Sequence, residues 1–317
     1  MEKLTVGLLI MATFAAAQVP IATFSIVGHD PQTGELGVAV ASRFFAVGSV
    51  VPWAKAGVGA IATQAFANTS YGWRGLELLE QGESPERVVE LLTASDDQPE
   101  RRQFGIVAAD GRSATYTGSG CNAWAGGRSG PHYACQGNIL AGEAVVTAME
   151  AAFLNTQGTL ADRLYAALSA GEENGGDARG KQSAALLVVK TGAGYGGFTD
   201  RAIDIRVDDH AEPFLELGRL LNLAQLNYAW NDAWTLFTQG NGKEALPLME
   251  RAAQIDPQHP EVLYDLAVIR LSAGDAPGAL QALQRALEIN PKLKAQALVD
   301  DDLLQLREYG EFKAMTE

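Results

Sequence analysis

Cysteine and histidine are scarce in this chain, which limits the chemistry open to it. Its 317 residues include two cysteines, Cys121 and Cys135, and four histidines. Neither cysteine belongs to a CxxC pair, and the histidines show no metal-ligand spacing, so the sequence predicts neither a metal site nor a dithiol redox centre. The four histidines are His29, His132, His210 and His259.

Basic residues are also few relative to acidic ones. The chain has 24 Lys and Arg against 38 Asp and Glu, a net charge of -14. This charge repels polyphosphate backbones, so we expect no nucleic-acid partner. Hydrophobic residues make up 47% of the sequence, which excludes a disordered chain. The length leaves room for one large domain or two ordinary ones.

The first residues have the pattern of a secretory signal peptide. Lys3 precedes an apolar run over residues 4–17 that ends in Ala15-Ala16-Ala17. The run is shorter than the roughly 20 residues that cross a bilayer, so we expect a signal peptide at 1–17 rather than an uncleaved anchor. The protein is then secreted or periplasmic. In such a compartment Cys121 and Cys135 form a disulfide or are simply buried, and the sequence leaves both open.

Residues 23–221 alternate between groups of strands and pairs of helices. A β-hairpin is predicted over 23–27 and 36–41, because turn pairs such as Asp30-Pro31 lie between them. A helix follows from residue 68 or 70 to Gly82, and Ser84 with Pro85 begins another. The pattern further predicts strands at 48–51, 58–63, 103–108, 114–117, 133–136, 183–190 and 202–207, and helices at 142–155 and 160–171.

This order does not fit a doubly wound sheet, in which strands and helices alternate singly. It fits two antiparallel sheets stacked face to face, with a helical layer outside each. We therefore predict an α+β protein whose first domain, 23–221, is a four-layer αββα sandwich.

Residues 222–317 have no strand-like run and instead repeat with a period of 34. The spacing separates Gly240 from Gly274 and Ala245 from Ala279, and it also relates 252 to 286 and the pairs 256–257 and 290–291. This is the period of tetratricopeptide (TPR) repeats, with small residues where paired helices approach closely. The sequence predicts a small all-α TPR-like domain closed by an amphipathic helix over 300–315. So short an array needs a surface to pack on, either the first domain or a partner.

Several familiar motifs are excluded. Gly192, Gly194 and Gly197 satisfy GxGxxG, but a strand-like run follows them rather than a helix, so we interpret them as a hairpin turn. No HExxH, Walker loop or GxSxG occurs. The run Asp208-Asp209-His210 is typical of a solvated turn.

Thr23 is the residue most open to a catalytic interpretation. A threonine with a free α-amino group holds nucleophile and base in one residue, because an amine with a pKa near 8 accepts the hydroxyl proton at neutral pH. Thr23 lies a few residues beyond the signal peptide, so residues 18–22 form a short propeptide in this interpretation. The alternative is an ordinary β-branched strand residue.

A resemblance to a known family favours the catalytic interpretation. The chain resembles the DUF1028 family over residues 23 to about 221, on the segments 23–27, 37–43, 50–59, 62–64, 136–140 and 180–183. That family is grouped with the N-terminal nucleophile (Ntn) hydrolases, which include the proteasome β subunits. The resemblance therefore implies an Ntn-hydrolase-like sandwich.

The resemblance also implies roles for individual residues. Thr23 is the nucleophile, and Ser42 and Arg43 match an Asp-Ser-Arg-like stretch whose acid is absent here. Lys55 is the candidate for the cation beside the nucleophile, with an exposed turn as its alternative position. Oxyanion donors are expected around Thr63, Gln64 and Asn68, and substrate contacts at Asn138, Asp177, Arg179, Gln182 and Ser183.

Two functions follow from these patterns. The first is an exported hydrolase that cleaves an amide bond in a small molecule or peptide and needs no cofactor. The second is a catalytically inactive envelope scaffold whose repeats bind a protein or peptide partner. The sequence also leaves room for a homo-oligomer.

Overall fold

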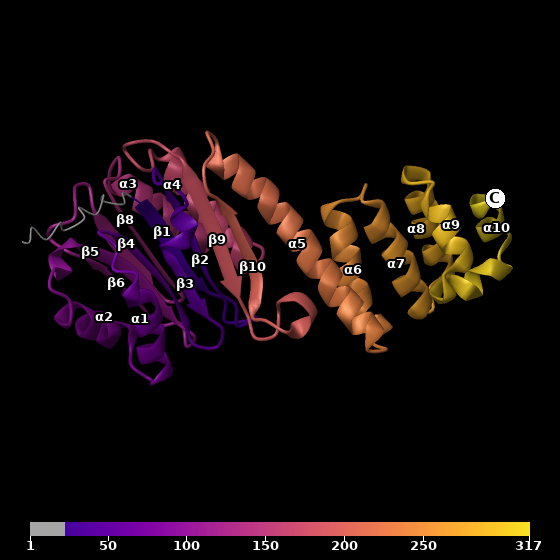
Figure 1. Cartoon of the computed structure of the whole chain (residues 1–317), viewed down its shortest axis with the longest axis horizontal. Helices are drawn as coiled ribbons and strands as arrows, with labels where there is room; N and C mark the ends of the chain where they lie inside the picture. Colours follow the sequence, from indigo (N-terminus) through magenta and orange to yellow (C-terminus); the bar gives the residue numbers. More distant parts are fainter. Residues whose placement is uncertain (1–22) are drawn as a thin grey trace, which may run out of the picture.

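The computed structural model describes residues 23–317, so the predicted signal peptide and propeptide lie outside the described residues. The first module contains two antiparallel sheets (Figure 1). One sheet has six strands in the order β10-β9-β2-β1-β8-β7, and the other has four in the order β3-β4-β5-β6. The strands are β1 Thr23–His29, β2 Leu36–Ser42, β3 Pro52–Lys55, β4 Gly59–Ala65, β5 Arg102–Ala108, β6 Ser113–Thr117, β7 Gly126–Gly130, β8 Tyr133–Asn138, β9 Ser183–Val189 and β10 Arg201–Val207.

A helical layer covers the outer face of each sheet, as predicted. Helices α3 (Glu143–Asn155) and α4 (Leu160–Glu173) pack on the six-stranded sheet, and α1 (Ser70–Glu80) and α2 (Pro85–Ala94) pack on the four-stranded one. Local chemistry explains the boundaries: Ser84 caps α2 by accepting a hydrogen bond from the Arg87 amide, and Thr159 caps α4 in a capping box. The α+β class and the four-layer αββα arrangement are thus confirmed.

The space between the sheets is filled by alternate residues of the central strands. At one end it is apolar, with Val27, Val38 and Ala60 among its buried residues. Toward the start of β1 the same face carries buried polar residues, beginning with Thr23 and Ser25. Because side chains alternate along a strand, the residues between them, such as Phe24, point instead into the helical layer.

Two strand predictions need correction. Residues 48–51 are not a strand: Val47–Ser49 form a 3-10 turn, and the strand paired with β4 is β3, which lies between the two predicted strands 48–51 and 58–63. Gly48 is needed there because a Cβ would lie 2.6 Å from the Ala185 side chain. Pro52 fits the first position of β3 because this is an edge strand. Strand β7 was not predicted, since Gly126–Gly130 lacks β-formers.

The second module is a run of helices beyond the sheets (Figure 1). It consists of α5 Pro213–Thr238, α6 Gly242–Ile255, α7 Pro260–Ser272, α8 Ala276–Ile289, α9 Leu293–Val299, a 3-10 segment Asp301–Glu308 and α10 Gly310–Thr316. The last two replace the single closing helix predicted over 300–315. None of the helices described within 23–317 combines the length and apolar character needed to span a membrane.

Helix α5 belongs to both modules. Phe214, Leu217 and Leu221 pack in the core that α3 and α4 form on the six-stranded sheet. Further along the helix, Leu226 and Ala229 belong to the core of the repeats. The boundary predicted between residues 221 and 222 therefore falls inside one continuous helix.

Candidate active site

Thr23 begins β1, and its side chain faces the polar end of the space between the sheets. Its Oγ1 donates a hydrogen bond to Ser42 Oγ at 3.2 Å, and both residues are buried. Across the other neighbouring strand, Thr23 is in register with Asn138 at the end of β8. The sheet thus brings together three of the predicted residues, from segments far apart in the sequence.

Gln64 of β4 reaches Thr23 from the opposite sheet. Its Nε2 donates to the Thr23 carbonyl at 3.0 Å and to Gln103 Oε1 at 2.9 Å, while its Oε1 accepts from Ser25 Oγ at 2.6 Å. Asn138 Nδ2 also donates to Gln103 Oε1, at 3.0 Å. Gln64 therefore fixes the backbone of Thr23, and Gln103 links Gln64 to Asn138 because its Oε1 accepts from both.

The network extends to residues that the sequence analysis did not select. Gln136 Nε2 donates to Ser25 Oγ at 2.6 Å, and Gln103 Nε2 donates to the Gly137 carbonyl at 2.7 Å. Gly105 leaves room for this arrangement, because a Cβ there would lie 2.0 Å from Gln136 Oε1. The available signal was a polar residue at an inward position of an otherwise apolar strand, as at Ser25, Gln103 and Gln136.

The buried carboxylate of Asp177 contacts the backbone of Arg43, the residue that follows Ser42. Asp177, from the segment after α4, accepts a hydrogen bond from the Arg43 amide at 2.9 Å and others from the Arg179 amide and guanidinium, each at 2.9 Å. The Arg43 guanidinium in turn donates to the Arg179 carbonyl. A carboxylate from a distant segment therefore holds the backbone at the end of β2.

The two predicted residues next to β9 have different positions. Ser183 is opposite Ser42 in the β2–β9 register, and its hydroxyl donates to the Phe44 carbonyl and accepts from the Val47 amide at 3.2 Å. This fixes the turn after β2. Gln182 instead donates to Asp209 at 3.1 Å on the exposed surface, so it lies outside the polar layer.

Lys55 lies away from Thr23. Its Nζ is 2.6 Å from Glu80 Oε1 on α1, and both side chains are about half exposed. Lys55 is in register with Gly59, whereas Gln64 contacts Thr23 from the other end of the same strand, roughly 17 Å away at 3.4 Å per residue. The alternative, exposed position is the one observed, and Lys55 places no charge beside Thr23.

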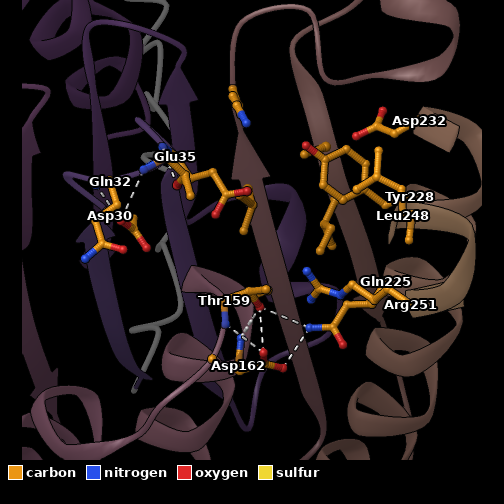
Figure 2. A pocket seen from close by; sticks show the side chains of 18 residues that line it. Asp30, Gln32, Glu35, Thr159, Asp162, Gln225, Tyr228, Asp232, Leu248 and Arg251 are labelled. Carbon is orange, nitrogen blue, oxygen red and sulfur yellow. Dashed lines mark hydrogen bonds between the residues drawn. The ribbon is translucent and has the colours of Figure 1, made fainter. Parts of the chain in front are cut away.

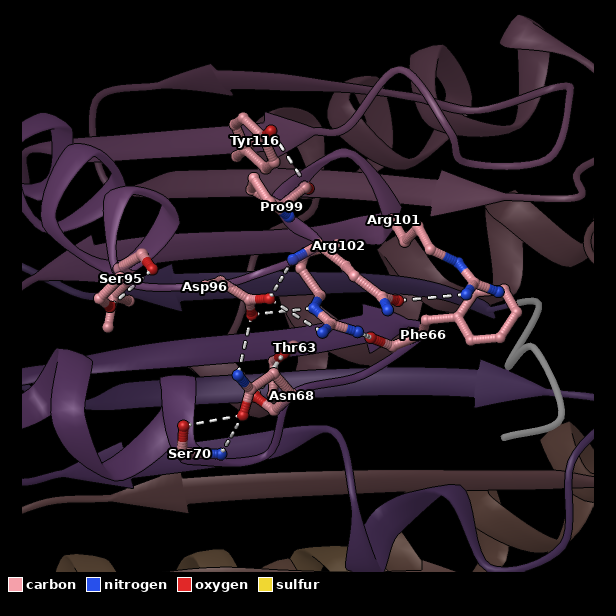
Figure 3. Close-up of polar contacts among 12 residues, drawn as sticks. Thr63, Phe66, Asn68, Ser70, Ser95, Asp96, Pro99, Arg101, Arg102 and Tyr116 are labelled. Carbon is pink, nitrogen blue, oxygen red and sulfur yellow. Dashed lines mark hydrogen bonds and ion pairs between the residues drawn. The ribbon is translucent and has the colours of Figure 1, made fainter. Parts of the chain in front are cut away.

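Thr63 and Asn68 belong to a second polar cluster, around Asp96 (Figure 3). Thr63 precedes Gln64, so its side chain faces the helical layer, where Oγ1 donates to the Asn68 carbonyl at 3.3 Å. The Asn68 side chain accepts hydrogen bonds from the Ser70 amide and hydroxyl at the start of α1 and donates to Asp96 at 2.9 Å. Both residues hold the turn between β4 and α1, and this is a structural role.

Asp96 is the centre of that second polar cluster. Its carboxylate receives two hydrogen bonds from Arg102, at 2.9 and 3.0 Å, and both side chains are largely buried. Burial by itself opposes ionisation, but the bonds from Arg102 and Asn68 outweigh it and hold the pKa of Asp96 well below its ordinary value. The cluster stabilises the β4–α1 connection rather than forming part of the candidate site.

The cysteines are both free. Cys135 is buried on the helical side of β8, with Sγ 3.7 Å from the Val146 carbonyl, whereas Cys121 Sγ lies 3.4 Å from the Arg102 carbonyl. Burial raises the pKa of the Cys135 thiol to about 12. Within residues 23–317, no three or more His, Cys, Asp or Glu side chains gather in a way that could hold a metal ion.

The geometry defines a class of protein: an αββα sandwich whose first strand presents a threonine to a buried amide network, joined by a shared helix to helical repeats. The chain belongs to DUF1028, a family of unknown function whose model matches residues 23–217. A tetratricopeptide repeat model matches residues 236–300.

One solved structure extends the comparison. The crystal structure of a protein from Silicibacter pomeroyi, assigned to DUF1028, is 32% identical in sequence. The match covers 64% of this chain and 86% of that one, with a TM-score of 0.60. No curated protein matches the chain.

Proposed function

We propose that this protein is an exported hydrolase of amide bonds in which Thr23, once it is the first residue of the mature chain, is the nucleophile. The observation that carries the proposal is the position of Thr23 at the start of β1, with Oγ1 3.2 Å from Ser42 Oγ and its carbonyl held by Gln64. The signal-peptide pattern at 1–17 supports export, and removal of residues 18–22 frees the amine.

The proposed reaction uses groups on Thr23 itself. Its Oγ attacks the substrate carbonyl carbon, and its α-amine takes the hydroxyl proton. The amine then passes this proton to the leaving nitrogen as the carbon–nitrogen bond breaks and an acyl ester forms on Thr23. Water hydrolyses the ester and restores the threonine, with release of a carboxylic acid. No metal or cofactor takes part in these steps.

The surrounding residues position the nucleophile in this proposal. Ser42 orients the threonine hydroxyl, and Gln64 fixes the Thr23 backbone. The Asn138 side-chain amide, on the residue in register with Thr23, is the donor to the oxyanion in this proposal. Asp177 and Arg43 hold the end of β2, and with it Ser42.

The first experiment is N-terminal sequencing and intact-mass measurement of protein exported by a host with a working secretion pathway. A mature chain that begins at Thr23 supports the proposal. A chain that keeps residues 18–22 after prolonged incubation blocks the amine and overturns it. Running Thr23→Ala in parallel shows whether the cut depends on the threonine itself, as self-cleavage requires.

The second experiment is hydrolysis of a panel of amide substrates. Thr23→Ala should abolish turnover, whereas Thr23→Ser should retain part of it because hydroxyl and amine both survive. Thr93→Ala is the control, since that hydroxyl bonds only to carbonyls of its own helix α2. The rate should rise with pH up to about 8 as the amine loses its proton. Full activity of the alanine variant would exclude Thr23 as nucleophile.

The repeat module favours a second candidate function, recruitment of a protein partner. Tetratricopeptide arrays expose extended surfaces suited to protein binding, and residues 236–300 match such an array. In this alternative the first module is an inactive scaffold. It predicts that residues 18–22 remain in the mature protein and that partner capture is unaffected by Thr23→Ala.

A further inference from the structure

A cavity of about 540 Å³ lies between the first module and the helical module (Figure 2). Its walls come from the turn between β1 and β2, from α4, β9 and β10 on one side, and from α5 and α6 on the other. The volume is within the range of small-ligand sites, roughly 300–1,000 Å³. The cavity is separate from Thr23, which faces the space between the two sheets.

Part of the wall is apolar. Val188 and Ile203 contribute from the sheet. Tyr228 and Leu248 line the cavity from α5 and α6 (Figure 2). Such a wall favours a ligand with apolar side chains, because their contact with these residues removes apolar surface from water.

Four charged side chains that line the cavity have no ion-pair partner among the described residues. Glu35 and Asp232 provide negative charge, and Lys190 and Arg251 provide positive charge. Glu35 is only 8% exposed. Burial raises the pKa of both Glu35 and Asp232, and the nearby charge of Lys190 opposes the shift in each case. Lys190 therefore lies close enough to influence both carboxylates without forming a direct pair with either.

The other acids in the wall are already engaged. Asp162 completes the cap of α4 with Thr159 and accepts a hydrogen bond from Gln225 of α5 at 2.7 Å. Asp30 accepts turn amides and lies 4.0 Å from Arg163. These contacts shape the cavity and hold α5 against α4. Glu35 is engaged as well, because its carboxylate accepts hydrogen bonds from the Thr33 hydroxyl and the Leu160 amide. Asp232, Lys190 and Arg251 are therefore the charged groups open to a ligand.

We infer that this cavity binds a short peptide of two or three residues with apolar side chains and free termini. The peptide ammonium would bind Asp232 on α5, while Lys190 balances the charge of Glu35. The peptide carboxylate would bind Arg251, because a guanidinium matches a carboxylate with two parallel hydrogen bonds. The site draws on both modules, so an occupied cavity ties the repeats to the sandwich.

The test is isothermal titration calorimetry of the full chain with Leu-Leu dipeptide. Two matched probes remove one charge each: N-acetyl-Leu-Leu lacks the ammonium, and Leu-Leu amide lacks the carboxylate. We expect Leu-Leu to bind and each blocked peptide to bind at least about tenfold more weakly, which corresponds to one lost charged contact. Equal binding of all three peptides, or none by Leu-Leu, overturns the proposal.

Two variants test which residue binds each end of the peptide, Asp232 for the ammonium and Arg251 for the carboxylate. Asp232→Asn should weaken Leu-Leu about tenfold or more and remove its advantage over the acetylated probe. Arg251→Gln should do the same relative to the amide probe. Glu244→Gln and Arg285→Gln are exposed helix controls in the same module and should change nothing. Loss of binding in the controls would contradict a local site.

Hydrogen exchange provides a readout that needs no variant. Saturating Leu-Leu should slow exchange both in the turn at residues 30–35 and along α5 and α6, because the ligand bridges the modules. Protection confined to the β1 end near Thr23 would place the peptide at the candidate active site and overturn the proposal. Mass analysis of the recovered peptide separates binding in the cavity from hydrolysis, so failure of either proposal is distinguishable from failure of the other.

Discussion

Replacing Gln64 with leucine removes the central amide of the polar layer while keeping a side chain of similar size. The substitution eliminates hydrogen bonds to the Thr23 carbonyl at 3.0 Å, to Gln103 at 2.9 Å and from Ser25 at 2.6 Å. Each is worth about 1 kcal/mol net, so the three together predict a loss of about 3 kcal/mol. The loss stays near this value because Gln103 and Ser25 retain bonds from Asn138 and Gln136.

The assay is hydrogen exchange of the backbone amides of β1, β4 and β8, which reports the opening free energy of the first module in the intact chain. Gln81→Leu, an exposed change at the end of α1, is the matched control and should leave exchange unaltered. A decrease in opening free energy below about 1 kcal/mol for Gln64→Leu would refute the conclusion that this amide holds the layer together.

Two further predictions concern the second polar cluster and the thiols. Asp96→Asn should lower the free energy of unfolding by about 3–5 kcal/mol, because Arg102 keeps its charge in a largely buried position without a partner. Since the folded pKa of Asp96 is depressed, its contribution is present above an unfolded pKa of about 3.9 and is lost as pH falls through the folded value. Urea titrations at pH 7 and pH 3 should therefore show a smaller difference between variant and parent at the lower pH, and an equal difference would contradict this account. Alkylation in denaturant without reductant should modify both Cys121 and Cys135, and a mass showing neither modified would contradict the free thiols.

Features set by local chemistry were predictable from the sequence. Ser84 followed by Pro85 marks the start of α2, and the 34-residue spacing of small residues such as Gly240 and Gly274 marks the repeats. The hairpin of β1 and β2 was likewise readable from its turn residues. In each case the deciding contacts lie within a few residues of one another or recur at a fixed period.

Features set by contacts across the fold were not predictable in the same way. Residues 52–55 form strand β3 because they pair with β4 at the edge of the sheet, which their own side chains do not indicate. Gln64 was selected, but Gln103 and Gln136, which complete its network, come from 39 and 72 residues further along the chain. For Lys55 the sequence left two positions open, beside Thr23 or exposed, and only the β3–β4 register shows that it lies opposite the end of β4 far from Gln64.

The shared helix α5 has a consequence for how this protein can change over evolutionary time. Its 26 residues form one unbroken rod, about 39 Å long at 1.5 Å per residue. Inserting a single residue between Leu221 and Leu226 would swing the repeats by about 100° around the rod, away from the wall that they share with the sandwich. A length change of about seven residues, two full turns, restores the angular phase but still moves the repeats by about 10 Å along the helix axis. Because one continuous helix takes part in both cores, the length of α5 fixes the angle between the modules, and we expect that length to vary as little as a core residue does.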